Sequence, residues 1–77
     1  MAKQWHISIA KYNPDTNGVK EKRLRDFGGY ESALKAFNKR AHLPIVLWHD
    51  NAVNLDNPYF AMIESQAYKE EYKKIID

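Results

Sequence analysis

The feature that most constrains the fold is a turn signal between two extended segments. Residues 13–18 read Asn-Pro-Asp-Thr-Asn-Gly, in which proline presets the φ angle of a turn's second position and Asn-Gly suits a position with positive φ. The preceding residues 4–12 alternate with the period of two that is typical of a half-buried strand: Trp5, Ile7 and Ile9 against His6, Ser8 and Ala10. This combination predicts a β-hairpin.

The second arm of the hairpin is unusually charged. Residues 19–26 read VKEKRLRD, and in a regular strand the two apolar members, Val19 and Leu24, would point to opposite faces. We therefore expect a bulge or an early end to this strand. Because lysine and arginine discourage pairing with another chain, a strand of this kind is expected at a sheet edge.

A helix and a third strand are expected after the hairpin. Phe27-Gly28-Gly29 breaks the second strand, and residues 30–42 carry apolar side chains on one side, as in an amphipathic helix. We expect this helix to cover the face that bears Trp5, Ile7 and Ile9. Residues 45–48, Ile-Val-Leu-Trp, contain no polar side chain, which favours a strand contacted from both sides.

A second helix is predicted to follow a polar loop. Residues 50–56 are rich in Asn and Asp, and Asn57-Pro58 combines an N-cap residue with proline at the first helical position. The helix would begin near Pro58. Its apolar residues are expected on two adjacent sides, the first with Phe60, Ile63 and Ala67 and the second with Tyr68, Tyr72 and Ile75.

These elements predict a small single domain of the α+β class over residues 1–77, in the order ββαβα. A right-handed crossover through the first helix places the third strand beside the first. The sheet is therefore expected to be three-stranded and antiparallel, with strand order 2-1-3, and to pack with two helices. No internal repeat, linker or low-complexity segment divides the chain.

The amino-acid composition limits the class of protein and the cellular location that fit this chain. With 44% apolar residues the chain has enough hydrophobic surface for a core, and the absence of cysteine excludes disulfides, thiolate nucleophiles and cysteine-based zinc sites. No segment approaches the roughly 20 apolar residues of a membrane span, and the N-terminus lacks the apolar run of a signal peptide. We expect a cytoplasmic protein that does not enter a membrane.

No recognised catalytic or metal-binding motif is present. The sequence lacks a phosphate-binding glycine loop, a His-Glu-x-x-His pair and a Gly-x-Ser-x-Gly elbow, so we expect no enzymatic activity and no cofactor. The three histidines, His6, His42 and His49, match no standard zinc spacing. The acidic loop after residue 49 misses the spacing and the glycine of a calcium loop, so no metal site is expected.

Trp48 suggests a binding surface. It follows Leu47 and so points to the opposite face, near His6 and the basic residues of the second strand. The leading hypothesis is a regulatory protein-binding module of inhibitor or adaptor type, using Trp48, His6, Tyr68 and Tyr72. The alternative role of Trp48 is structural, with the second helix packing on it through Phe60 and Ile63.

Two other functions stay open. Residues 1–42 carry a net charge of +5 and residues 43–77 a net charge of −3, and such an asymmetry either presents a basic surface to an anionic partner or makes the two halves of one fold attract each other. A nucleic-acid binder would use the basic residues of the hairpin, namely Lys11, Lys20, Lys22, Arg23 and Arg25. The third hypothesis is an oligomeric structural component, joined through the edge of the third strand or the end of the second helix.

The first half of the chain has a resemblance in layout to known phage proteins. A Trp-led strand, an Asn/Gly turn, a basic strand and Phe27-Gly-Gly-Tyr-Glu-Ser-Ala-Leu before a helix are broadly similar to the arm-type DNA-binding domains of phage integrases, although the separate third strand before the helix is missing. Small phage-encoded inhibitors of host enzymes share the layout. The resemblance implies a phage or mobile-element protein, and it fits both binding hypotheses, because architecture alone does not fix function.

Overall fold

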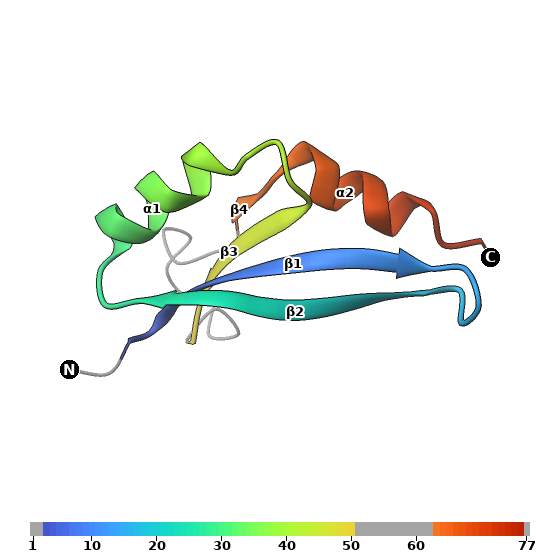
Figure 1. The fold of residues 1–77 in the computed structure, drawn as a ribbon, viewed down its shortest axis with the longest axis horizontal. Helices are drawn as coiled ribbons and strands as arrows, with labels where there is room; N and C mark the ends of the chain where they lie inside the picture. Colours follow the sequence, from blue (N-terminus) through green and yellow to red (C-terminus); the bar gives the residue numbers. More distant parts are fainter. Residues whose placement is uncertain (1–2, 51–62, 77) are drawn as a thin grey trace, which may run out of the picture.

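The fold combines one antiparallel sheet with two helices. The computed structural model describes residues 3–50 and 63–76. Its elements, in chain order, are β1 (Trp5–Asn13), β2 (Gly18–Phe27), α1 (Tyr30–Lys39), β3 (Ile45–His49), β4 (Ile63–Glu64) and α2 (Gln66–Lys73) (Figure 1). The strand order is β2-β1-β3-β4. The α+β class is confirmed, but the prediction of three strands is wrong, because β4 adds a fourth beside the 2-1-3 arrangement.

The hairpin forms around the predicted turn. β1 and β2 pair from Trp5 opposite Phe27 to Asn13 opposite Gly18. Asn17 has a φ of 51°, the left-handed conformation for which an Asn-Gly turn is suited. The hydroxyl of Tyr12 donates a hydrogen bond to Oδ1 of Asn17 at 2.9 Å, which ties the turn back to the strand.

The predicted bulge lies at Leu24. Ile7 pairs with Arg25 and Ser8 pairs with Arg23, so Leu24 is one extra residue in β2. Side chains alternate along a strand, and one extra residue reverses their parity from that point onward. Arg25 and Phe27 therefore lie on the same face of the sheet as Ile7.

Helix α1 covers the predicted face of the sheet. Ala33 and Phe37 pack with Trp5, Ile7 and the inward residues of β3 in the larger hydrophobic core. The helix ends at Lys39, three residues earlier than predicted. The backbone N–H of Arg40 bonds to the carbonyl of Phe37, and that of Leu43 bonds to the carbonyl of Arg40. These tight turns redirect the chain into β3.

The prediction for the second helix is wrong in its position. Ile63 lies in β4, opposite Leu47, and packs with the core on the α1 side of the sheet. Pairing with β3 satisfies backbone groups at a sheet edge that would otherwise be open, and this outweighs the helical spacing of the sequence. The helix begins only after Ser65. The predicted start at Asn57-Pro58 and the contribution of Phe60 lie outside the described residues.

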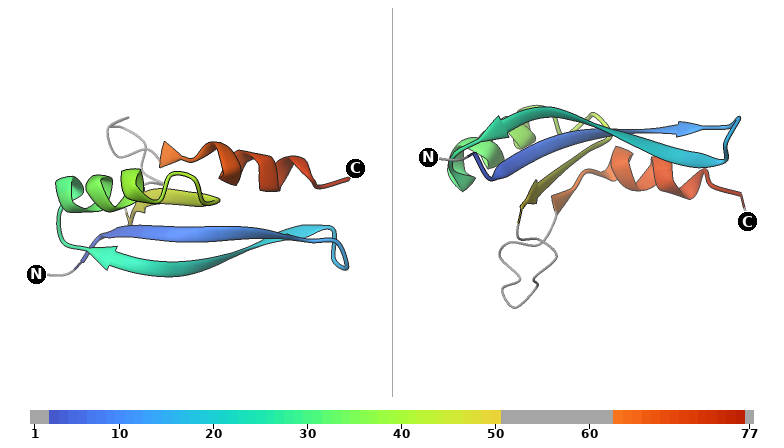
Figure 2. Two further views of the ribbon diagram at one scale, coloured as in Figure 1. Left: turned by 45° about the horizontal axis from the view of Figure 1, so that its top comes forward. Right: turned by 90° about the horizontal axis from the view of Figure 1, so that it is seen from below.

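Helix α2 lies beside the half of the hairpin that α1 does not reach. Figures 1 and 2 show the two helices one after the other along the molecule, with the hairpin extending past the end of α1. Tyr68 packs with Ala10 and Val46 on the face opposite α1. Beyond the end of β3, the backbone N–H of Tyr12 donates instead to the carboxylate of Glu71 at 3.0 Å. In the described ranges, no helix has the length and apolar character to cross a membrane.

Candidate functional site

The basic residues of the hairpin are divided between the two faces of the sheet. Lys22 pairs with Ile9 and Lys20 pairs with Lys11, so the three lysines lie on the α1 face, in the half of the hairpin beyond the helix. All three are exposed. We call Lys11, Lys20 and Lys22 the hairpin basic face. Arg25 lies farther along the same face, whereas Arg23 lies on the opposite one.

The lysines of the hairpin basic face form no ion pair in the described structure. The ion pairs in the described parts of the chain involve neither these three lysines nor Arg25, so no carboxylate oxygen lies within 4 Å of their charged nitrogens. Glu21 lies between Lys20 and Lys22 in sequence but points to the other face, where it accepts hydrogen bonds from Tyr68 and Tyr72. Like charges directly across a ladder repel, so the pair of Lys11 and Lys20 costs stability.

An open hollow adjoins these lysines. Its volume is about 780 Å³, and it is lined by the three lysines together with Ile9, Tyr12, Asn13, Pro14 and Glu21. Positive side chains thus border a partly apolar depression on the surface. The shape suits an extended anionic chain better than a small enclosed ligand, because small-molecule sites bury most of their ligand.

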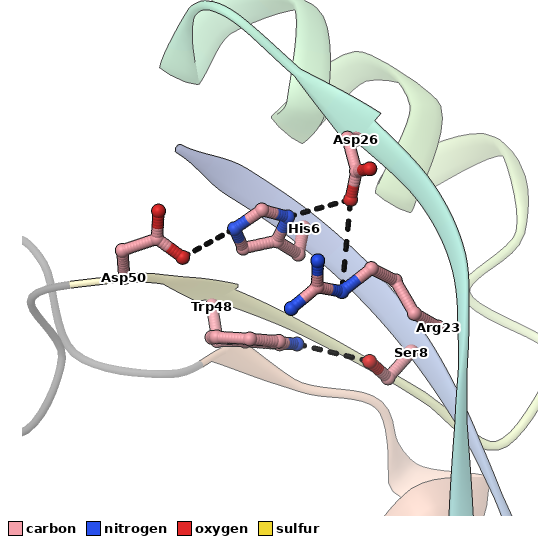
Figure 3. Close-up of polar contacts among 6 residues, drawn as sticks. All are labelled: His6, Ser8, Arg23, Asp26, Trp48 and Asp50. Atoms are coloured by element: carbon pink, nitrogen blue, oxygen red, sulfur yellow. Dashed lines mark hydrogen bonds and ion pairs between the residues drawn. The ribbon is translucent and has the colours of Figure 1, made fainter. Parts of the chain in front are cut away.

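A second cluster lies on the opposite face, around Trp48 (Figure 3). Trp48 is half-buried, and its indole Nε1–H donates to Oγ of Ser8 at 3.0 Å. The His6 ring lies 4.5 Å from the Trp48 ring, and the guanidinium carbon of Arg23 lies 5.1 Å from its centre. The structure therefore brings together Trp48, His6 and a basic residue of β2, as the sequence suggested.

His6 joins three segments of the chain in this cluster. Its Nδ1 lies 2.6 Å from a carboxylate oxygen of Asp26 and its Nε2 lies 2.5 Å from one of Asp50. His6 is 2% exposed. With both nitrogens engaged inside the protein, the ring offers neither a free base nor a free metal ligand.

Tyr68 and Tyr72 attach α2 to the hairpin. Tyr68 is 4% exposed, and both hydroxyls donate to Oε2 of Glu21. Burial, followed by the hydroxyl contacts with Tyr72 and Glu21, raises the pKa of Tyr68 far above its ordinary value. Of the four residues predicted to contact a partner, Trp48 and Tyr72 remain partly exposed, whereas His6 and Tyr68 are enclosed. Partner contact by any of the four stays a prediction.

Sequence reasoning missed two groups of residues. Asp26 and Asp50 hold His6, and only the cross-strand pairing of His6 with Asp26 could have indicated the first of them. The second group consists of basic residues that line a groove beside β2, two of them on α1 and one directly after it: Lys35, Lys39 and Arg40. The four-residue spacing of Lys35 and Lys39 was the available signal, since such residues share a helix side.

Metal ligation and similarity to known proteins give no further assignment. Across residues 3–50 and 63–76, no group of three or more His, Cys, Asp or Glu side chains is arranged to hold a metal ion. No family model matches the chain, and no curated protein or solved structure matches it. Function is therefore inferred from the charge, shape and exposure of the surface.

Proposed function

We propose that this protein binds nucleic acid through the hairpin basic face. The observation that carries the proposal is the direct opposition of Lys11 and Lys20 on the part of the α1 face beyond the helix, without a carboxylate within 4 Å in the described structure. Their mutual repulsion is relieved when phosphate groups lie between and beside them. Phosphate contacts of this kind release counterions, which supplies much of the affinity of nucleic-acid binding proteins.

The shape of the hairpin supports a polymeric ligand. Beyond Ile9 the sheet consists only of β1 and β2, because the pairing with β3 ends at Ile45. A two-stranded ribbon fits the major groove of duplex DNA and can also lie along a single strand. Arg23 is not part of this contact surface, since its guanidinium lies over Trp48 on the other face and 3.7 Å from Asp26.

The proposal is tested by measuring the binding of fluorescently labelled duplex and single-stranded oligonucleotides at increasing salt. The hairpin variant carries Lys11→Gln, Lys20→Gln and Lys22→Gln. A matched control removes the same charge from exposed positions elsewhere, with Lys3→Gln, Lys69→Gln and Lys73→Gln. We expect the control to bind as the unmodified protein does, and the hairpin variant to bind at least about tenfold more weakly at low salt with a flatter salt dependence.

The salt dependence provides a second readout. The logarithm of the binding constant falls against the logarithm of salt concentration with a slope near −0.9 per phosphate contacted on duplex DNA and about −0.7 on a single strand. Three lost contacts therefore change the slope by roughly two to three. Absence of any complex at low salt, or equal weakening in the hairpin and control variants, contradicts the proposal.

A second candidate function, protein binding of inhibitor or adaptor type, is supported by the cluster around Trp48. A half-buried tryptophan beside an arginine that is half exposed resembles the composition of binding hot spots. Capture of a protein partner should persist after nuclease treatment, and Trp48→Ala should abolish this capture. Because Trp48 packs against the core of Ala10, Val46 and Tyr68, the variant's thermal unfolding must be compared with that of the unmodified protein. A variant that simply unfolds would exclude Trp48 as a binding site.

Neither candidate function requires catalysis or subunit assembly. The β3 edge that the oligomer hypothesis invoked is paired with β4 at Val46 and Leu47. β2 is left as the long edge strand of the sheet, with a bulge and exposed charges that oppose edge pairing. Sedimentation at high concentration tests the hypothesis, and a monomer would exclude it.

A further inference from the structure

A second basic groove lies between β2 and α1. Its volume is about 420 Å³. Arg25 and Phe27 form the strand side, and Lys35, Lys39 and Arg40 line the helix side. None of the residues that line this groove is acidic, and in the described structure these four cations form no ion pair. The groove therefore concentrates positive charge along a second part of the surface.

The groove continues the hairpin basic face. Lys22 pairs with Ile9 and Arg25 pairs with Ile7, so these two cations occupy successive positions on the same face of β2. The bulge at Leu24 creates this continuity, because without it Arg25 would point to the face of Arg23. Positive side chains thus extend from near the turn of the hairpin to the solvent side of α1.

The groove also has apolar surface. Phe27 is half-buried, and the guanidinium of Arg25 lies 5.3 Å from the centre of its ring. An adjoining hollow of about 230 Å³ is lined by Ile7, Leu24 and Ala36 among others, and Leu24 is 46% exposed. A duplex presents its phosphates outward and keeps its bases stacked inside. A single strand offers both phosphates and base faces, and it matches a surface of cations beside apolar groups.

We infer that the nucleic acid is single-stranded and runs from the hairpin basic face into the α1–β2 groove. Lys35 and Lys39 contact its phosphates there, and bases pack against Phe27 and Leu24. This inference rests on the proposed function, and it adds the strand state of the ligand and a second contact region. Duplex binding on the hairpin alone is the competing outcome.

The experiment compares three ligands of equal length by fluorescence anisotropy: a single-stranded oligonucleotide, its duplex, and an abasic single strand that keeps the phosphates. The groove variant carries Lys35→Gln and Lys39→Gln, and the matched control carries Lys69→Gln and Lys73→Gln. A third variant, Leu24→Gln, removes apolar surface at an exposed position without removing charge. Circular dichroism confirms that each variant is folded.

We expect the unmodified protein to prefer the single strand over the duplex, and to bind the abasic strand roughly tenfold more weakly, as expected for lost base packing. The groove variant should lose about tenfold in single-strand affinity at low salt, and the control should lose nothing. Leu24→Gln should weaken binding of the normal single strand but not of the abasic one.

Failure of the inference is distinguishable from failure of the proposed function. If the unmodified protein binds none of the ligands, the proposed function itself is wrong. If the hairpin variant loses binding while the groove variant binds as the unmodified protein does, binding stands and the groove contact is overturned. Equal or tighter binding of the duplex, or equal binding of the abasic strand, overturns the assignment to a single strand.

Discussion

Lys11 and Lys20 lie directly opposite each other across the β1–β2 ladder, on the part of the α1 face that extends beyond the helix. Nearby carboxylates are directed elsewhere, with Glu21 held by two tyrosines and Glu71 held by the backbone of Tyr12 and by Lys74. The positive surface is therefore maintained at a cost to folding. Binding and stability should respond in opposite directions to changes at these positions.

The first prediction concerns Lys20→Glu. Replacing a like-charge pair by an opposite-charge pair should raise the free energy of unfolding by about 0.2–1 kcal/mol, measured as an increase in the urea midpoint. The same change should weaken nucleic-acid binding at least tenfold. Lys3→Glu, at an exposed position outside the hairpin, serves as the control. A variant that is less stable than the unmodified protein would argue against repulsion between Lys11 and Lys20.

The second prediction concerns Tyr68 at alkaline pH. Burial raises the pKa of Tyr68 in the folded protein, with further contributions from Tyr72 and Glu21, whereas the unfolded chain has a tyrosine pKa of about 10. Above about pH 10, the unfolded state therefore binds fewer protons than the folded state. Stability from this group is therefore present below about pH 10 and is lost as the pH rises further. Urea midpoints measured up to about pH 11 should fall less steeply for Tyr68→Phe. An identical fall of the urea midpoint with pH in the two proteins would contradict this prediction.

The third prediction concerns Ser65, which is 5% exposed. Its hydroxyl donates to the carbonyl of Leu43 at 2.6 Å and accepts from the backbone N–H groups of Ile45 and Tyr68. One side chain thus caps α2 and joins it to β3. Ser65→Ala should lower the free energy of unfolding by about 1–2 kcal/mol. The exposed Ser32, replaced by alanine, should change stability little.

The fourth prediction concerns the contact between the hairpin turn and the C-terminal residues. The Asn17 side chain accepts a hydrogen bond from the N–H of Ile76 and donates one to its carbonyl. Glycine tolerates the positive φ of Asn17, so Asn17→Gly removes these bonds without backbone strain. The amide hydrogen of Ile76 should then exchange with solvent faster, as measured by NMR. Unchanged exchange would show that the side chain does not hold this end of the chain.

Much of the fold could be predicted because its signals are local. The alternation around Ile7, the Asn-Gly turn and the one-sided spacing of residues 30–42 each depend on near neighbours in sequence. β4 could not be predicted in this way. Ile63 and Glu64 form a strand only because β3 offers an open edge, and two residues carry no period of their own.

The candidate site was predictable in composition but not in arrangement. The sequence identifies Lys11, Lys20 and Lys22 as basic residues on extended segments, yet the pairing of Lys11 with Lys20 depends on the register of the two strands. The bulge, which the sequence does not locate, is what places Arg25 on the same face. The contact of His6 with Asp50 joins a residue of β1 to the residue that follows β3, far away in the chain. Such contacts follow from topology, so they appear only once the strand order is known.

The extra residue at Leu24 has a consequence for how this protein should be compared with any future relative. A chain with the same residues in β2 but no bulge would pair Leu24 with Ile7 and turn Arg25 and Phe27 away from the helix, toward the face of Trp48. Two such chains would look identical when aligned and would present different electrical surfaces. The presence of the bulge at this point of the strand, more than the identity of its residues, would then be the mark of a shared ligand.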